Sequence, residues 1–339
     1  MGNKPHTPAK STRDELSIAE HVRGVLDQNR RILSQTITKI ESQLPRHQEQ
    51  SDQIVQALLP HRKESIRIAV SGIPGAGKST LIEQLGLLAL QKDHRVAVLA
   101  IDPTSTISRG SIMGDKTRME QLAQSGKAFI RPSPTAGSLG GVARKTRETI
   151  SICEAAGYDL ILIETVGVGQ SEISARSMTD MFLLVLIPGT GDELQGIKRG
   201  VMEITDLVII NKADGTNRSC ALETQQKYQN VLHFLTPVSR GWLQKVETCS
   251  ALLNQRIDII WENIQQFQKT TRQNGFFQQR RSLQAYQWFL DIVEQHLKEA
   301  FYSRPPIQRE LQLLKEEILQ NKLFPTLAAR RILDLFFKK

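Results

Sequence analysis

The chain has little of what marks secreted, zinc-binding or membrane-spanning proteins. Its three cysteines, Cys153, Cys220 and Cys249, lie far apart and form no CxxC pair, which argues against a disulfide framework and against a zinc site. The longest apolar run, Met181 to Ile187, is far shorter than the roughly 20 residues needed to span a bilayer. The polar N-terminus lacks the apolar stretch of a secretory signal. We therefore expect a cytoplasmic protein.

Acidic residues are fewer than basic ones, with 35 Asp and Glu against 44 Lys and Arg and a formal charge of +9. This balance suits nucleic acid, anionic lipid or a phosphorylated ligand. Aromatic residues make up only 5% of the chain, no RNP-type motif or zinc finger is present, and the basic residues are spread rather than clustered. We expect no nucleic acid or membrane partner. A nucleic-acid-binding protein stays an alternative, which filter binding at low salt would test.

The two ends of the chain are helical in pattern. Apolar residues from Ile18 to Ile40 recur at helical spacing, and a second, short helix is expected over 51–59, between Pro45 and Pro60. After Arg256 the pattern is helical again, with wide apolar faces. These late helices could pack on the rest of the protein or form a dimerisation arm, because an apolar helix face serves either purpose.

Between these ends, short β-branched runs alternate with helical stretches. Apolar runs separated by helices predict an α/β fold with a mostly parallel sheet covered on both faces. In such sheets, ligands bind beyond the carboxyl ends of the strands. The expected strands lie within 66–72, 95–102, 128–132, 158–165, 181–189, 206–214 and 246–251.

A phosphate-binding loop follows the first of these strands. The stretch GIPGAGKST satisfies G-x-x-x-x-G-K-[ST] between a strand and a helix. Its glycines let backbone amides point at phosphate oxygens, and the helix N-terminus adds its positive end. Lys78 is expected to reach the β- and γ-phosphates, and Ser79 to offer a hydroxyl to Mg²⁺. The expected phosphate cradle is Gly72, Ile73, Pro74, Gly75, Ala76, Gly77, Lys78, Ser79 and Thr80.

The tetrapeptide NKAD, with Asn211, Lys212 and Asp214, closes a later strand. A carboxylate such as that of Asp214 can accept hydrogen bonds from both the N1–H and the 2-amino group of guanine, a donor pair that adenine lacks. Coming several strands after a phosphate loop and at a strand end, this tetrapeptide favours GTP over ATP.

Carboxylates stand at the other strand ends. Asp102 and Asp115 lie in or beside a long polar connection, and Glu164 closes the strand YDLILIET. Together with Ser79 they are the expected Mg²⁺ environment, since Mg²⁺ prefers hard oxygen ligands, directly or through water.

These motifs resemble the MeaB/ArgK-type P-loop GTPases, whose human member assists methylmalonyl-CoA mutase. The resemblance runs in order through GIPGAGKST, DPTS, GSIMGDKTRM, RPSP with GGVARKTRE, ETVGVGQSE, GDELQGIKRG, NKADG and the C-terminal RILDLF. It covers nearly the whole chain after residue 60. It implies a tail with helices over 1–60, a P-loop GTPase domain over 61–255 and a helical dimerisation region over 256–339.

The resemblance also implies a function. The family's members are homodimers that bind GTP with Mg²⁺, and their client is an adenosylcobalamin-dependent mutase whose cofactor loading and protection they gate. Base contacts carry over to Asn211, Lys212 and Asp214, and to the Ser-Ala segment Ser250, Ala251 and Leu252. The third switch loop carries over to Asp192, Gln195 and Lys198, which would relay the nucleotide state to the client.

The chain departs from the family pattern at two places. Arg109 precedes Gly110 where another glycine is usual, and no glycines follow Ser250 and Ala251. These departures could mark a divergent paralogue with another client.

The stretch ETVGVGQSE, from Glu164 to Glu172, lacks a glutamine after Gly167 and has Val168 instead. Valine cannot orient the attacking water, so we predict slow intrinsic hydrolysis that a partner, a dimer neighbour or a rearranged switch loop accelerates. Gln170 and Lys198 are the internal candidates for completing the site. The expected catalytic residues are Lys78, Glu164, Gly167 and Lys198.

A second reading treats the chain as a kinase or a transport ATPase of the lysine/arginine/ornithine system, a label once attached to relatives of this family. That reading predicts a preference for ATP and a phosphorylated acceptor, and NKAD argues against it.

Overall fold

The computed structural model describes residues 16–42, 44–101, 119–132, 139–165, 170–189 and 199–337. The chain divides into two compact units, Met1–Gln278 and Gln279–Lys339. The first unit contains the sheet and the second is helical. Among the described residues, no helix combines the length and apolar character needed to cross a bilayer.

The sheet of the first unit has seven strands in the order β3-β2-β4-β1-β5-β6-β7, and all pairings are parallel. This confirms the predicted α/β fold. Nearly all residues of the five central strands are buried, as expected for strands covered on both faces. The strands are β1 (Ile66–Gly72), β2 (Val96–Ile101), β3 (Ala128–Arg131), β4 (Leu160–Thr165), β5 (Met181–Leu186), β6 (Leu207–Ile210) and β7 (Lys245–Thr248).

Strand register brings the motifs together. β1 lies between β4 and β5, with Val70 opposite Glu164 and Gly72 opposite Val185. The loop after β1 therefore starts beside the carboxyl end of β4. The parallel pairing of β6 with β5 puts Asn211, just past β6, at the same edge of the sheet.

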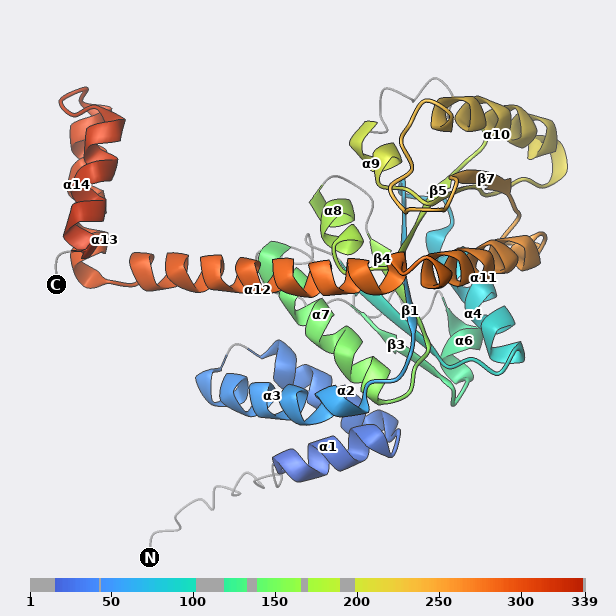
Figure 1. Ribbon diagram of the computed structural model, residues 1–339, viewed down its shortest axis with the longest axis horizontal. Coiled ribbons are helices and arrows are strands. Elements are labelled where there is room, and N and C mark those ends of the chain that lie inside the picture. Colours follow the sequence, from blue (N-terminus) through green and yellow to red (C-terminus); the bar gives the residue numbers. More distant parts are fainter. Residues whose placement is uncertain are drawn as a thin grey trace, which may run out of the picture. The chain divides into compact units, whose positions relative to one another are not determined.

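Helices cover both faces of the sheet (Figure 1). One face packs on α4 (Lys78–Gln91), α6 (Glu120–Gln124) and α11 (Ile257–Gln273), around buried residues such as Ile68, Leu85 and Ile260. The other face packs on α7 (Leu139–Ala155), α8 (Gln170–Arg176) and the N-terminal helices. A separate cluster joins β5, β6 and β7 to α9 (Arg199–Glu203) and α10 (Arg218–Leu232). Two short 3₁₀ helices are η1 (Leu59–His61) and η3 (Gly215–Asn217).

The N-terminal helices are α1 (Ile18–Leu26), α2 (Arg30–Glu41) and α3 (Pro45–Leu58). Ser17 and Glu20 form a capping box at the start of α1, and Asn29 caps α2. The expectation of a short helix over 51–59 was wrong at its start, because α3 already begins at Pro45. Proline is favoured in the first turn of a helix, where its missing N–H has no intrahelical partner in any case.

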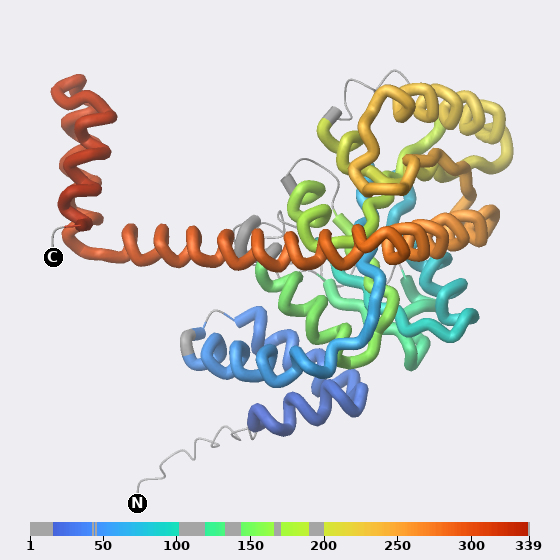
Figure 2. The backbone as a smooth tube through the Cα atoms, in the orientation of Figure 1, coloured from blue at the N-terminus to red at the C-terminus, as the bar shows by residue number. Residues whose placement is uncertain are grey.

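The second unit consists of helices (Figure 2). It comprises α13 (Pro305–Leu319), α14 (Pro325–Phe337) and most of α12 (Phe276–Tyr302). Its small core holds Ile307, Leu314, Ala328 and Ile332. The domain boundary proposed between 255 and 256 stays a prediction, and α11, which follows it, packs on the sheet of the first unit.

Candidate functional site

The phosphate loop joins β1 to α4 at the carboxyl edge of the sheet. Gly77 is the residue before α4 and has a left-handed φ of +85°. A Cβ atom there would lie 2.5 Å from the Asn211 amide nitrogen, so glycine is required both for the backbone angle and for this close approach. Gly75 is also left-handed, but a Cβ atom on it would meet nothing within 4 Å. The loop is therefore open at Gly75 and closed against Asn211 at Gly77.

Lys78 is the first residue of α4 and is only 8% exposed. Its ammonium group donates hydrogen bonds to the carbonyl oxygens of Gly72, at 2.9 Å, and Ile73, at 3.1 Å. The charge is thus held within the curve of the loop, next to the positive N-terminal end of the helix. Both features attract an anion such as a phosphate group.

Ser79 and Glu164 meet beside the phosphate loop. The Ser79 hydroxyl donates a hydrogen bond of 2.8 Å to Glu164 Oε1. A hydroxyl and a carboxylate are hard oxygen donors of the kind that Mg²⁺ accepts, so this pair fits the ion predicted from the sequence. The other two predicted ligands, Asp102 and Asp115, lie outside the described residues.

Asn211 connects the two halves of the site. It is 2% exposed, its amide nitrogen donates to the Ala76 carbonyl at 2.8 Å, and its amide oxygen accepts from the Ala251 N–H at 3.0 Å. The Ser250 hydroxyl donates to the Asp214 carboxylate. The phosphate loop, the NKAD segment and the Ser-Ala segment are therefore joined by hydrogen bonds.

Two further residues of the predicted base site also have defined positions. Lys212 has a left-handed φ of +60°. The side chain of Leu252 is 79% exposed and lies just after the buried Ala251.

The turn after Ala251 explains why glycines are usual there. Asn254 and Arg256 have φ angles of +52° and +61°, in the left-handed region that glycine occupies without strain. Asparagine tolerates this region better than most residues. The Arg256 side chain donates to the Thr248 carbonyl at 2.8 Å, which holds the turn in place without glycine.

Several residues expected at the site lie outside the described residues. These are Arg109, Gly167, Val168, Asp192, Gln195 and Lys198. Their roles stay predictions.

The basic residues of VARKTRE contact the protein's own chain. Arg144 pairs with Glu148 at 3.1 Å, Lys145 donates to the Ile40 carbonyl of α2, and Arg147 donates to the Ser177 hydroxyl at 2.6 Å. Burial lowers the pKa of Lys145 and raises the pKa of Glu148. These contacts fasten α7 to its neighbours.

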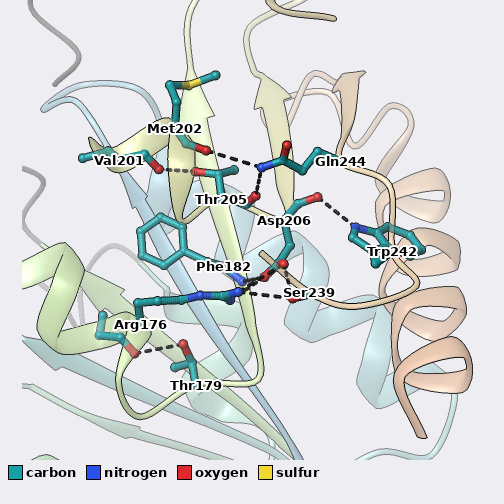
Figure 3. Close-up of polar contacts among 11 residues, drawn as sticks. Arg176, Thr179, Phe182, Val201, Met202, Thr205, Asp206, Ser239, Trp242 and Gln244 are labelled. Carbon is teal, nitrogen blue, oxygen red and sulfur yellow. Dashed lines mark hydrogen bonds and ion pairs between the residues drawn. The ribbon is translucent and has the colours of Figure 1, made fainter. Parts of the chain in front are cut away.

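A buried polar network around Asp206 was not anticipated from the sequence (Figure 3). Asp206 precedes β6 and is fully buried, and its carboxylate accepts hydrogen bonds from Arg176 at the end of α8, from the Phe182 N–H and from the Ser239 hydroxyl. Its carbonyl accepts from the Trp242 indole at 2.9 Å. One residue thus joins α8, β5 and the loop before β7. The sequence signal was an aspartate directly before an apolar strand.

Comparison with known proteins places this site in a family. Residues 33–305 match the family model described as methylmalonyl Co-A mutase-associated GTPase MeaB. A "Putative GTPase" of Caulobacter vibrioides is 45% identical and covers 91% of this chain and 94% of its own length. For "GTPase ArgK" of Escherichia coli these values are 40%, 94% and 96%.

Two further comparisons agree. A mouse protein named "Methylmalonic aciduria type A homolog, mitochondrial" is 40% identical and covers 98% of this chain and 83% of its own length. A crystal structure titled "LAO/AO transport system kinase" has a TM-score of 0.78 and 35% identity, and covers 96% of this chain and 99% of its own. The chain belongs to the MeaB family of P-loop GTPases, as the order of its motifs predicted.

Proposed function

We propose that the joined site binds GTP, with the phosphates in the loop Gly72–Thr80 and the guanine at the NKAD and Ser-Ala segments. The observation that carries this proposal is the pair of hydrogen bonds made by Asn211, which fix the base side of the site against the phosphate loop. The hydrogen bond from Ser250 orients the Asp214 carboxylate. In this proposal Leu252, which is exposed, covers one face of the base.

The substitution Asp214→Asn tests the base site. An ionised carboxylate accepts from two guanine donors, whereas an amide offers one acceptor and one donor, which leaves a guanine N–H unpaired. We expect affinity for GTP to fall by about 100-fold, on the scale of hydrogen bonds to charged groups. Xanthosine triphosphate, which has a carbonyl in place of the 2-amino group, should bind the variant better than it binds the wild type. Titration with labelled nucleotides measures both effects.

Asp258→Asn is the matched control, since Asp258 is an exposed aspartate in the first turn of α11. It should leave both affinities unchanged. An Asp214→Asn variant that keeps the wild-type preference for GTP over xanthosine triphosphate would contradict the assignment.

We also propose Mg²⁺ as the metal, held by Ser79 and Glu164 with Asp102 and Asp115 nearby. The ion would neutralise charge that develops on the phosphates. Lys78 would bind the β- and γ-phosphate oxygens, Gly167 would present its amide to the γ-phosphate, and Lys198 would join the catalytic residues when hydrolysis is triggered. With Val168 in place of a glutamine, hydrolysis stays slow until a partner arrives.

For the biological role, we propose a GTP-dependent chaperone of an adenosylcobalamin-dependent mutase of the methylmalonyl-CoA mutase type. It would act in the cytoplasm and gate the loading and protection of the cofactor. The support is the family description, which names this mutase, and the name of the mouse relative. The segment with Asp192, Gln195 and Lys198 would relay the nucleotide state to the client.

We further propose a homodimer formed through the C-terminal helices. Its support is the row of exposed apolar side chains on α12, which a partner helix would cover. This row includes Leu283, Tyr286, Phe289, Leu290, Val293 and Leu297.

Association with purified methylmalonyl-CoA mutase tests the client. We expect co-elution on size-exclusion chromatography whose extent changes between GDP and a non-hydrolysable GTP analogue. An absence of co-elution in every nucleotide state would refute the chaperone role while leaving the GTPase intact. The kinase title of the related crystal structure suggests a second test, because ATP should then displace bound GDP as well as GTP does.

A further inference from the structure

A groove of about 480 Å³ lies at the amino edge of the sheet, at the opposite ends of the strands from the phosphate loop. Ile66 and Leu160, the first residues of β1 and β4, form part of its wall, and α11 forms the other side. The phosphate loop follows the last residue of β1. The groove is therefore separate from the nucleotide site, and its volume is in the range of small-molecule sites.

The groove has an apolar floor and a polar side. Ile66, Leu160, Trp261 and Ile264 line it and are each at most 5% exposed. Successive turns of α11 add the polar side chains Gln265, Gln268 and Lys269. A floor of this kind accepts an apolar body, while the polar side chains select what is attached to it.

The charges that line the groove leave one cation without a partner. Glu64 pairs with Arg272 at 2.5 Å, and Asp159 pairs with His94 at 2.9 Å. Lys269 is exposed and makes no ion pair or hydrogen bond with any described residue. Because both lining carboxylates already have a basic partner, the uncompensated charge in the groove is positive.

Two buried hydrogen-bond donors in the groove wall also lack an acceptor among the described residues. They are the indole N–H of Trp261 and the Nε–H of Arg272. Buried donors normally have a protein or water partner, and leaving one unpaired costs about 1–3 kcal/mol. The side chain of His94 packs edge-on against Trp261, with ring centroids 5.1 Å apart, and is 35% exposed. Unpaired donors and an unpaired cation favour a ligand that brings acceptor oxygens.

We propose that this groove binds a small carboxylate with an apolar body. The apolar part lies on Ile66, Leu160 and Trp261, and the carboxylate lies beside Lys269 and the α11 amides. The site is independent of the proposed function, because none of its residues belongs to the nucleotide site.

Benzoate tests the proposal on the full-length protein, with benzamide and benzylamine as neutral and cationic probes of the same shape. The reporter is the indole N–H signal of Trp261 in the protein labelled with ¹⁵N-tryptophan. The chain has only three tryptophans, Trp242, Trp261 and Trp288, so Trp→Phe variants assign the signals. Benzoate should shift the Trp261 signal saturably and leave the Trp242 signal in place. Benzamide and benzylamine should bind up to about fivefold more weakly, the scale of one exposed ion pair.

The variant Lys269→Gln should remove the preference for benzoate over benzamide without altering the spectrum of the free protein. Lys227→Gln, an exposed lysine on α10, is the matched control and should keep that preference. No saturable shift of the Trp261 signal would overturn the proposal. Equal affinity for all three probes, or a benzoate preference that survives Lys269→Gln, would also overturn it.

Discussion

The variant Lys78→Ala is expected to lose GTP hydrolysis by at least about 100-fold in kcat/KM, the scale reported for removing one preorganised donor to a developing negative charge. The Lys78 ammonium is already held within the phosphate loop by two backbone carbonyls, so little reorganisation is needed when phosphate oxygens replace those partners. No other lysine or arginine lies within the phosphate loop itself. Single-turnover hydrolysis with radiolabelled GTP measures the effect.

The same helix provides the control for this prediction. Lys92 is the exposed C-cap residue of α4, and Lys92→Ala should leave hydrolysis within about twofold of the wild type, as expected for a surface change. Thermal unfolding of both variants without nucleotide separates catalysis from folding. A folded Lys78→Ala protein that hydrolyses GTP at nearly the wild-type rate would contradict the proposed phosphate site.

The variant Asp206→Ala should lower the free energy of unfolding by about 3–5 kcal/mol, because it leaves the buried Arg176 guanidinium without its anion. Arg176 is 6% exposed and Asp206 is fully buried, so solvent cannot replace the lost partner. The Phe182 N–H and the Ser239 hydroxyl lose the same acceptor. Chemical denaturation of the protein without nucleotide measures the loss.

A double-mutant cycle shows whether the ion pair is the cause. Replacing both partners, as in Arg176→Met with Asp206→Ala, should cost less than the sum of the two single changes, since no charge is then left buried and unpaired. Asp258→Ala, at an exposed site on α11, should change stability by less than about 0.5 kcal/mol. Additive effects of the two single variants would show that the pair is not coupled.

The strands and the phosphate loop could be predicted because their signals are local. A buried parallel strand requires a short continuous apolar run, and the phosphate loop requires glycines and a lysine at fixed spacing. All seven expected strands are present, and NKAD does follow β6. The start of α3 was missed because Pro45 was taken as a helix breaker, although proline is favoured in a first turn.

The Asp206 network and the amino-edge groove could not be predicted in the same way. Asp206 meets Arg176 and Ser239 across 30 and 33 residues of sequence, and only the packing of β5 and β6 brings them together. The groove combines the first residues of β1 and β4 with one side of α11, far apart in the chain. Contacts of this kind depend on strand order and helix position, which no short motif encodes.

Hydrolysis of GTP in the presence and absence of methylmalonyl-CoA mutase tests the central claim most directly. The experiment compares single-turnover rates for the isolated protein, for the protein with the mutase, and for the protein with an unrelated enzyme of similar size. With Val168 in place of a water-orienting glutamine, we predict slow hydrolysis alone and at least about tenfold faster hydrolysis with the mutase, a modest part of the 10³–10⁵-fold that completion of such sites gives elsewhere. Fast hydrolysis by the isolated protein, unchanged by the mutase, would contradict a GTPase that is held back until its client arrives.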